Sequence, residues 1–500
     1  MAKVTVDISQ VTAGYLEEKL QDNSDVQFAS FRNNYMPLLF ALTTYILTSY
    51  LYKRFSASSS SAKLPSQFLS RIYFSLTFSL IFLYVLFGNS LIKILIILTL
   101  SYLISMIFKG SKLNPVITWI FNLTILFLNE NYDGYRFEML DERLGFLDLN
   151  KGLLPRWNIT FNFSMLRIIS YNMDYYWSFH SSNDTREKID KNSSLLSDKS
   201  RIINPCFKED YNYIYYLSYI LYTPLYLAGP IITYNDFVSQ FRYPKEQNFK
   251  SIISYGLRLF SAIILMEFML HYMYVVAISK SGVYEGYTPF ELAMIGAFNL
   301  KLIWLKLLII WRFFRFWAMV DGIDTQENML RCMFNNYSTQ GFWRSWHRSY
   351  YRWIIRYIYI PLGGTKYAIY NILVVFTFVA IWHDITLSLL AWGWLIWLFI
   401  LPEAIATKVF SGKGWTNWQY FRHLCAIGCV LNLLTMWAAN LVGFAVGLDG
   451  MKFLLSEIFL TTDGLIALGL SCIAIFCAVQ IMFEVREEEK RKGINSDNRY

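Results

Sequence analysis

The segment NNYSTQGFWRSWHRSYYRWIIRYIYIPLGG, residues 335–364, is the part of the chain around which the rest is organised. It is preceded by DGIDTQENMLRC at 321–332 and followed by VAIWHD at 379–384, and long apolar stretches flank the whole region. Two of the five histidines, His347 and His383, lie within it. Ionisable residues between apolar stretches of membrane length are costly, so they indicate a functional site by default.

Residues 342–357 are expected to form one amphipathic helix. Arginines recur at every fourth position and would share one stripe, while aromatic residues cover most of the opposite side. The arginines are Arg344, Arg348, Arg352 and Arg356, and the aromatic residues are Phe342, Trp346, Tyr350, Trp353 and Tyr357. Such a helix lies in a headgroup layer more readily than it crosses a bilayer. His347 falls near the border between the two faces, and Pro361 with the following glycines ends the helix.

The second histidine stands at the end of an uncharged run. Residues 368–382 carry no charge, and another apolar run, 385–401, begins directly after His383 and Asp384. A neutral imidazole can take a proton from a hydroxyl near neutral pH. Asp384 could orient that imidazole, although adjacent side chains on a helix diverge.

Each feature also has a structural explanation. A histidine beside a tryptophan is common at a membrane interface, and an arginine stripe alone is more often a face for lipid headgroups. Trp343, Trp346 and Trp353 alone would form an aromatic belt. The functional interpretation therefore depends on these residues taken together.

Together, FWRSWH at 342–347, the IPLGG turn at 360–364 and WHD at 382–384 resemble the membrane-bound O-acyltransferase (MBOAT) family. DGIDTQENMLRC with FWRSWHRSYYRWIIRYIYIPLGG resembles more narrowly the fungal glycerol-uptake-protein (Gup) branch, which is related to Hedgehog acyltransferase. Looser similarity extends to WNITFNFSMLRIISYNMDYYWS at 157–178 and YTPLYLAGPIITYNDF at 222–237.

The resemblance implies transfer of a long-chain acyl group from acyl-CoA to a hydroxyl, in a helical core around a tunnel through the bilayer. His383 matches the family's general base. His347 matches a second position, commonly Asn or His, from which it could hydrogen-bond the thioester oxygen. An acidic residue can stand there in relatives like Hedgehog acyltransferase, so His347 leans away from N-acylation of a protein.

Substrate binding is assigned to residues around the two histidines, with no metal and no bound cofactor expected beyond acyl-CoA as donor substrate. These residues are Trp343, Arg344, Trp346, Arg348 and Asp384. Arg344 and Arg348 could hold the CoA phosphates, and anionic lipid headgroups are an equally good alternative.

Within the Gup branch, the implied reaction is glycosylphosphatidylinositol (GPI) anchor remodelling in the endoplasmic reticulum, by acylation of lyso-GPI. No residue identifies this acceptor. The alternatives are a glycerol transporter, which the broken segment 222–232 would suit, a protein acyltransferase of the Hedgehog acyltransferase type, and a catalytically silent scaffold. The chain shows no obvious internal repeat in favour of the transporter, and its intact histidines argue against the scaffold.

The composition indicates an all-α polytopic membrane protein. The 500 residues are 55% apolar and only 16% charged, too apolar for one soluble domain. The net charge of +9 suits cytoplasmic loops and anionic headgroups rather than nucleic acid. The six cysteines have no metal-ligand spacing with histidine. Packing is expected for most of them, and Cys332 is the one to consider for reactivity.

The loop charges predict a lumenal N-terminus, a cytoplasmic C-terminus and about 11 transmembrane helices, with further re-entrant or amphipathic helices. The expected spans are 36–52, 72–87, 91–108, 114–128, 213–232, 252–278, 289–317, 368–382, 385–401, 424–446 and 464–483. The expected organisation is a polar arm at 1–33, N-terminal helices and a lumenal loop at 34–156, an MBOAT core at 157–483 containing the catalytic stretch 321–384, and a tail at 484–500.

Overall fold

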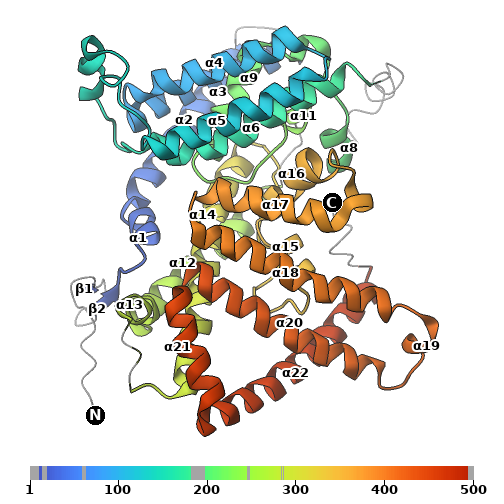
Figure 1. Ribbon diagram of the computed structural model, residues 1–500. Coiled ribbons are helices and arrows are strands. Elements are labelled where there is room, and N and C mark those ends of the chain that lie inside the picture. The colour runs from blue at the N-terminus through green and yellow to red at the C-terminus, as the bar shows by residue number, and fades with distance from the viewer. Residues whose placement is uncertain are drawn as a thin grey trace. The chain divides into compact units, whose positions relative to one another are not determined.

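The structure is a computed structural model that describes residues 11–13, 20–58, 64–181, 197–244, 248–282, 284 and 286–493. Most of these residues are helical, and one short antiparallel pair of strands, β1 (Val11–Ala13) and β2 (Leu20–Asp22), occurs among them (Figure 1). Eight described helices are long and apolar enough to cross a membrane. The prediction of an all-α polytopic membrane protein is confirmed.

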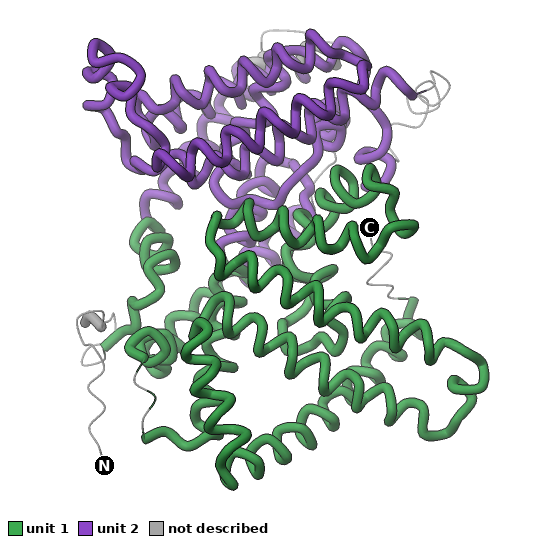
Figure 2. The backbone as a smooth tube through the Cα atoms, in the orientation of Figure 1, with its two compact units in different colours: residues 1–35, 258–309, 328–500 green, residues 36–257, 310–327 purple. Residues whose placement is uncertain are grey.

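The chain divides into two compact units, coloured separately in Figure 2. Unit 2 contains residues 36–257 and 310–327, and unit 1 contains residues 1–35, 258–309 and 328–500. Two long helices, α12 (Phe249–Tyr272) and α14 (Pro289–Val320), belong partly to each unit.

Unit 2 is a helical layer built on a buried aromatic core. Its elements are α2 (Tyr35–Ser58), α3 (Leu64–Phe87), α4 (Ser90–Phe108), α5 (Leu113–Asn131), η2 (Glu142–Leu149), α6 (Trp157–Ser178), α8 (Asp198–Ile203), η4 (Lys208–Asp210), α9 (Tyr213–Ile220), α10 (Thr223–Tyr226) and α11 (Tyr234–Arg242). Helices α4, α5 and α6 pack side by side (Figure 1). Helix α6 is buried along most of its length, as expected for a polar helix embedded in protein.

Unit 1 holds both histidines of the central stretch. Its elements are β1, β2, α1 (Val26–Asn33), α13 (Val275–Ser281), α15 (Thr339–Ser345), α16 (Arg348–Ile354), the π-helical turn η5 (Ile355–Tyr359), η6 (Gly364–Tyr367), α17 (Ala368–His383), α18 (Leu387–Val409), α19 (Lys413–Thr416), α20 (Phe421–Phe444), α21 (Gly447–Leu460) and α22 (Thr462–Arg491). Helix α18 packs between α17 and α20, and α20 packs against α21 and α22 (Figure 1). The short α15 packs against α18 and α20, and α16 packs against α15 and η5.

The break expected in the span at 213–232 is present, and the segment does not form one helix of membrane length. Helix α9 ends at Ile220, and Pro224 starts a new single turn, because proline lacks an amide hydrogen and suits the first turn of a helix. The buried Arg167 of α6 donates from Nη1 to the carbonyl of Ile220 at 2.7 Å and from Nη2 to that of Leu225. The guanidinium thereby satisfies carbonyls at the break, which lets irregular backbone persist inside unit 2.

Of the other ten expected spans, eight coincide with the long apolar helices. The remaining two, at 36–52 and 114–128, lie in helices α2 and α5, which are less apolar and are not among the eight.

The described part of the N-terminal arm is packed into unit 1. Asp22 accepts a hydrogen bond from the backbone N–H of Ala277 at 3.1 Å, and Lys306 Nζ lies 2.6 Å from a carboxylate oxygen of Asp25. Residues 20–33 are therefore built into the helical unit, while 1–10 and 14–19 lie outside the described residues.

Candidate active site

The expected single helix at 342–357 is broken at His347. Helix α15 ends at Ser345, α16 begins at Arg348, and His347 between them adopts φ 44° and ψ 51° in the left-handed region. Few non-glycine residues adopt this conformation, so the surrounding structure must hold it. The arginine stripe is interrupted as a result, with Arg344 exposed and Arg348 buried.

The break is caused by pairing with a preceding segment. The backbone N–H of Leu330 donates to the carbonyl of Ser345 at 3.3 Å, and Met329 forms an isolated antiparallel bridge with Trp346. Asn328 then receives two amide hydrogens from the start of α16, on its carbonyl at 3.1 Å and on its side-chain oxygen at 3.0 Å. Asn328 therefore caps the N-terminus of α16, although it lies far upstream of this helix in the sequence.

A carboxylate holds the start of α15. Glu403 of α18 accepts hydrogen bonds from the Ser338 hydroxyl, from the Thr339 N–H at 2.8 Å and, more weakly, from the Gln340 N–H at 3.4 Å. The side-chain amide of Asn432, on α20, donates to the same carboxylate at 3.1 Å. A negative charge at a helix N-terminus is stabilising, so Glu403 and Asn328 fix the two helices on either side of His347. An acidic residue inside an apolar span is the sequence signal that could have identified Glu403.

One tyrosine lies against both histidines. The Tyr350 ring centroid is 5.1 Å from the His347 ring and 6.4 Å from the His383 ring. His347 and Tyr350 are buried, whereas His383 is exposed at the C-terminal end of α17. The structure therefore brings together the two histidines that the sequence singled out, and it adds Tyr350, which the sequence placed only on an aromatic face.

The His383 ring is oriented by its own helix. Its Nδ1 lies 2.9 Å from the carbonyl oxygen of Val379, and a carbonyl can only accept, so Nδ1 carries the hydrogen. In a neutral imidazole, Nε2 then holds the free lone pair. Asp384 lies beyond the helix end in extended backbone, so Val379 takes the orienting role that was considered for Asp384.

Burial sets the protonation of the other two groups. Desolvation, followed by the nearby His383 imidazole, holds the pKa of His347 well below its ordinary value, so His347 is neutral at neutral pH. Burial raises the pKa of Tyr350 well above its ordinary value, so its hydroxyl keeps its proton. The site therefore combines a neutral imidazole, a hydroxyl donor and an imidazole with a free lone pair.

Comparison with known proteins identifies the family of this chain. Residues 146–447 match the sequence profile of the membrane-bound O-acyltransferase family, MBOAT. The chain belongs to this family. The Membrane-bound O-acyltransferase GUP1 of Saccharomyces cerevisiae is 45% identical over 97% of this chain and 86% of its own length. Its namesake from Candida tropicalis is 46% identical over 96% of this chain and 81% of its own. The mouse protein-cysteine N-palmitoyltransferase HHAT is more distant, at 29% identity over 39% of this chain and 40% of its own.

These matches confirm the resemblance to the MBOAT family, to its Gup branch and, more remotely, to Hedgehog acyltransferase. The chain is an acyltransferase and a multi-pass membrane protein. His347, His383, Asn328 and Glu403 all lie inside the residues that match the MBOAT profile.

The tryptophans near the MBOAT histidines are packing residues in this structure. Trp343 contacts the rings of Phe376 at 5.7 Å and Trp392 at 5.6 Å, and Trp346 stacks on Phe342 at 5.2 Å. They line the interior of unit 1, so an aromatic belt does not describe them. Their assignment to substrate binding stays a prediction, as do those of Arg344, Arg348 and Asp384.

The beginning of the polar stretch is an ionic framework within unit 2. Asp321 accepts from the Tyr222 hydroxyl at 2.5 Å and lies 3.6 Å from Arg71. Arg315 lies 3.6 Å from Glu327 and also donates to the carbonyl of Thr325. The charges of DGIDTQE are thereby neutralised by partners, which indicates a structural role for this part of the motif.

The stretch just before α15 is tied to the end of α22. Arg331 forms a two-pronged ion pair with Glu489 at 2.9 and 2.8 Å, and Arg486 donates to Asn335 at 2.9 Å. Lys301 Nζ lies 2.9 Å from the sulfur of Cys332. The first part of the expected tail at 484–500 is therefore helical and bound to unit 1.

No metal centre accompanies the MBOAT site within the described ranges. There, no group of three or more His, Cys, Asp or Glu side chains is placed to hold an ion.

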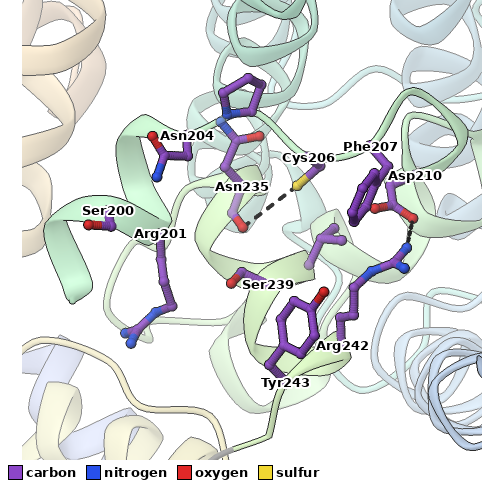
Figure 3. Close-up of a pocket in the computed structure, with 12 residues that line it drawn as sticks. Ser200, Arg201, Asn204, Cys206, Phe207, Asp210, Asn235, Ser239, Arg242 and Tyr243 are labelled. Carbon is purple, nitrogen blue, oxygen red and sulfur yellow. Dashed lines mark hydrogen bonds and ion pairs between the residues drawn. The ribbon is translucent and has the colours of Figure 1, made fainter. Parts of the chain in front are cut away.

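A hollow of about 500 Å³, including space open to solvent, lies in unit 2 and is shown in Figure 3. Arg242 pairs with Asp210 along its wall, and Arg201 pairs with Asp236 at 2.7 Å. The Cys206 thiol faces the carbonyl of Asn235, and burial raises the pKa of that thiol well above its ordinary value. The arginines of this hollow are paired with carboxylates and its thiol is protonated, and neither histidine of the central stretch lines it.

Proposed function

We propose that this acyltransferase moves a long-chain acyl group from acyl-CoA to a lipid hydroxyl, with His383 as the general base. The observation that carries the proposal is the His383 ring, whose Nδ1 is held by Val379 so that Nε2 keeps a free lone pair beside His347 and Tyr350. A base of this kind must reach the proton of the acceptor hydroxyl.

The reaction follows from these positions. Nε2 of His383 takes the proton of the acceptor hydroxyl as its oxygen attacks the thioester carbonyl carbon. The neutral His347 donates a hydrogen bond to the carbonyl oxygen as that atom becomes negative. The carbon–sulfur bond then breaks, and the departing CoA sulfur receives the proton from His383. The products are an ester and free CoA.

The acceptor in this proposal is the lyso form of a GPI anchor, and the location is the endoplasmic reticulum membrane with a lumenal N-terminus and a cytoplasmic C-terminus. The support for the acceptor and the compartment is the similarity to the fungal GUP1 proteins across nearly the whole chain. The support for the orientation is the distribution of Lys and Arg in the loops.

The test is acyl transfer from labelled long-chain acyl-CoA in membranes containing the wild type or His383→Ala, with lyso-lipids including lyso-GPI as acceptors. His180→Ala is a matched control, because His180 is also exposed at the end of a helix and its Nδ1 lies 3.1 Å from the carbonyl of Tyr176, four residues earlier. Wild type and His180→Ala are expected to transfer equally, and His383→Ala to fall to background at equal abundance. Equal transfer by His383→Ala would remove this histidine from the mechanism.

A second candidate, a protein acyltransferase, is favoured by the similarity to mouse HHAT over 39% of the chain. The same labelling separates the two, since the label would then enter the protein fraction and leave lyso-lipids unmodified.

A further inference from the structure

Tyr350 is an aromatic residue whose ring lies near both histidines. It lies in the first turn of α16, is 4% exposed, and packs on Trp382 at 4.6 Å as well as on both imidazoles. Its position is fixed from two sides, because Asn328 caps α16 while α17 carries Trp382 and His383.

The Tyr350 hydroxyl has no hydrogen-bond partner within the described chain that would explain its presence. Tyr350 Oη is buried and makes no hydrogen bond with any described residue. Leaving a buried hydroxyl unsatisfied destabilises a fold, and native structures satisfy most such groups. A phenylalanine would fill the same space without this cost, so ring packing alone does not account for a tyrosine here.

The reaction supplies the missing acceptor. The thioester carbonyl oxygen must lie within reach of the attacking hydroxyl, and hence close to the His383 imidazole that activates it. When the tetrahedral intermediate forms, this oxygen becomes an anion, and a donor held in place by buried packing, as the Tyr350 hydroxyl is, stabilises such an anion more than water does. The buried phenol keeps its proton and therefore remains a donor throughout.

We propose that Tyr350 is a catalytic residue whose hydroxyl donates a hydrogen bond to the thioester carbonyl oxygen as it becomes an oxyanion. The inference rests on the proposed function, which it extends from the two histidines to a third group. Tyr350 keeps its own proton throughout: the proton of the acceptor hydroxyl passes through His383 Nε2 to the departing CoA sulfur, and the phenol only donates a hydrogen bond to the oxyanion.

The test compares Tyr350→Phe with wild type in acyl transfer by purified protein in lipid nanodiscs. Loss of one oxyanion donor lowers kcat by about 10²–10³-fold in comparable sites, and we expect at least a 30-fold loss with KM within about threefold. Tyr351→Phe is the matched control, because the neighbouring side chain on the helix points about 100° away. It is expected to keep wild-type kcat.

A second measurement separates catalysis from packing. A thioether analogue of acyl-CoA lacks the carbonyl oxygen, so Tyr350→Phe and wild type are expected to bind it equally. The thermal midpoint of Tyr350→Phe should equal or exceed that of wild type, since an unsatisfied hydroxyl has been removed.

Three results would overturn the inference: kcat within twofold of wild type, weaker binding of the thioether, or a midpoint several degrees lower. Each leaves the His383 mechanism in place. Failure of wild type to transfer to any acceptor would instead refute the proposed function itself.

Discussion

Replacing Glu403 should lower kcat although Glu403 touches neither histidine. Its carboxylate holds the start of α15, the helix that leads to His347. In Glu403→Gln the amide oxygen can still receive the Thr339 and Asn432 donors, while the charge is lost. A hydrogen bond to a charged group contributes about 1.5–3 kcal/mol and a neutral one about 0.5–1.5. Two good hydrogen bonds are weakened at a half-buried site, so the free energy of unfolding of Glu403→Gln is expected to fall by about 2 kcal/mol. In Glu403→Ala all donors lose their acceptor, and the expected cost is about 3–5 kcal/mol.

The effect on rate follows from geometry. The chain reaches His347 directly after α15, and a displacement of about 1 Å at a reacting group can reduce the rate about 10²-fold. We therefore expect Glu403→Ala to lose about 10²-fold in kcat and Glu403→Gln about three- to tenfold, with thermal midpoints lowered in the same order. Purified variants in nanodiscs would be compared by acyl transfer and by thermal unfolding.

The control is Glu291→Gln, which removes the charge of another helix-capping carboxylate. Glu291 accepts from the Thr288 N–H at 2.8 Å at the start of α14, which carries neither histidine. Its kcat should stay at the wild-type value. If Glu403→Ala also kept wild-type kcat despite a lower midpoint, Glu403 would be a structural cap with no influence on the site, and the reasoning would be refuted.

Three further outcomes are expected. Because burial holds the pKa of His347 below its ordinary value of about 6.5, the free energy of unfolding should fall as the pH drops below about 6.5, where the unfolded chain binds a proton that the folded chain does not. Unfolding measured against pH should show a smaller fall in His347→Asn than in wild type, and an equal fall in both would contradict this. Asn328→Ala should lower the stability by about 1 kcal/mol through loss of a helix cap and reduce kcat more than KM, measured by unfolding and kinetics. Gly393→Ala should lower the thermal midpoint, because a Cβ there would lie 2.9 Å from the carbonyl oxygen of Phe376 and force α17 and α18 apart; an unchanged midpoint would show that the two helices shift freely.

Local pattern was enough to predict much of this molecule. Apolar runs of membrane length marked the eight long helices. The two histidines stood out because they are ionisable groups beside apolar spans, and the structure brings both against Tyr350.

The features that were missed depend on partners distant in the sequence. Helical periodicity at 342–357 gave no sign of the break at His347, since the break comes from pairing with Asn328 and the two residues after it. The break within 213–232 was expected from the sequence, but its partner Arg167, which donates to the carbonyl of Ile220, was not. A helical repeat of 3.6 residues describes only neighbours along the chain, so it cannot identify Asn328 or Arg167 as a partner.

The same distant contacts bear on the order of biogenesis. The catalytic segment is synthesised before the residues that hold it: Glu403 is 64 residues beyond Thr339, and Glu489 is 158 residues beyond Arg331. At about 5–20 residues per second, the second interval lasts roughly 8–30 s. During that time the segment lacks its final anchors. We expect the nascent enzyme to be inactive until α22 is inserted. A chain stalled midway through insertion would then consume no acyl-CoA.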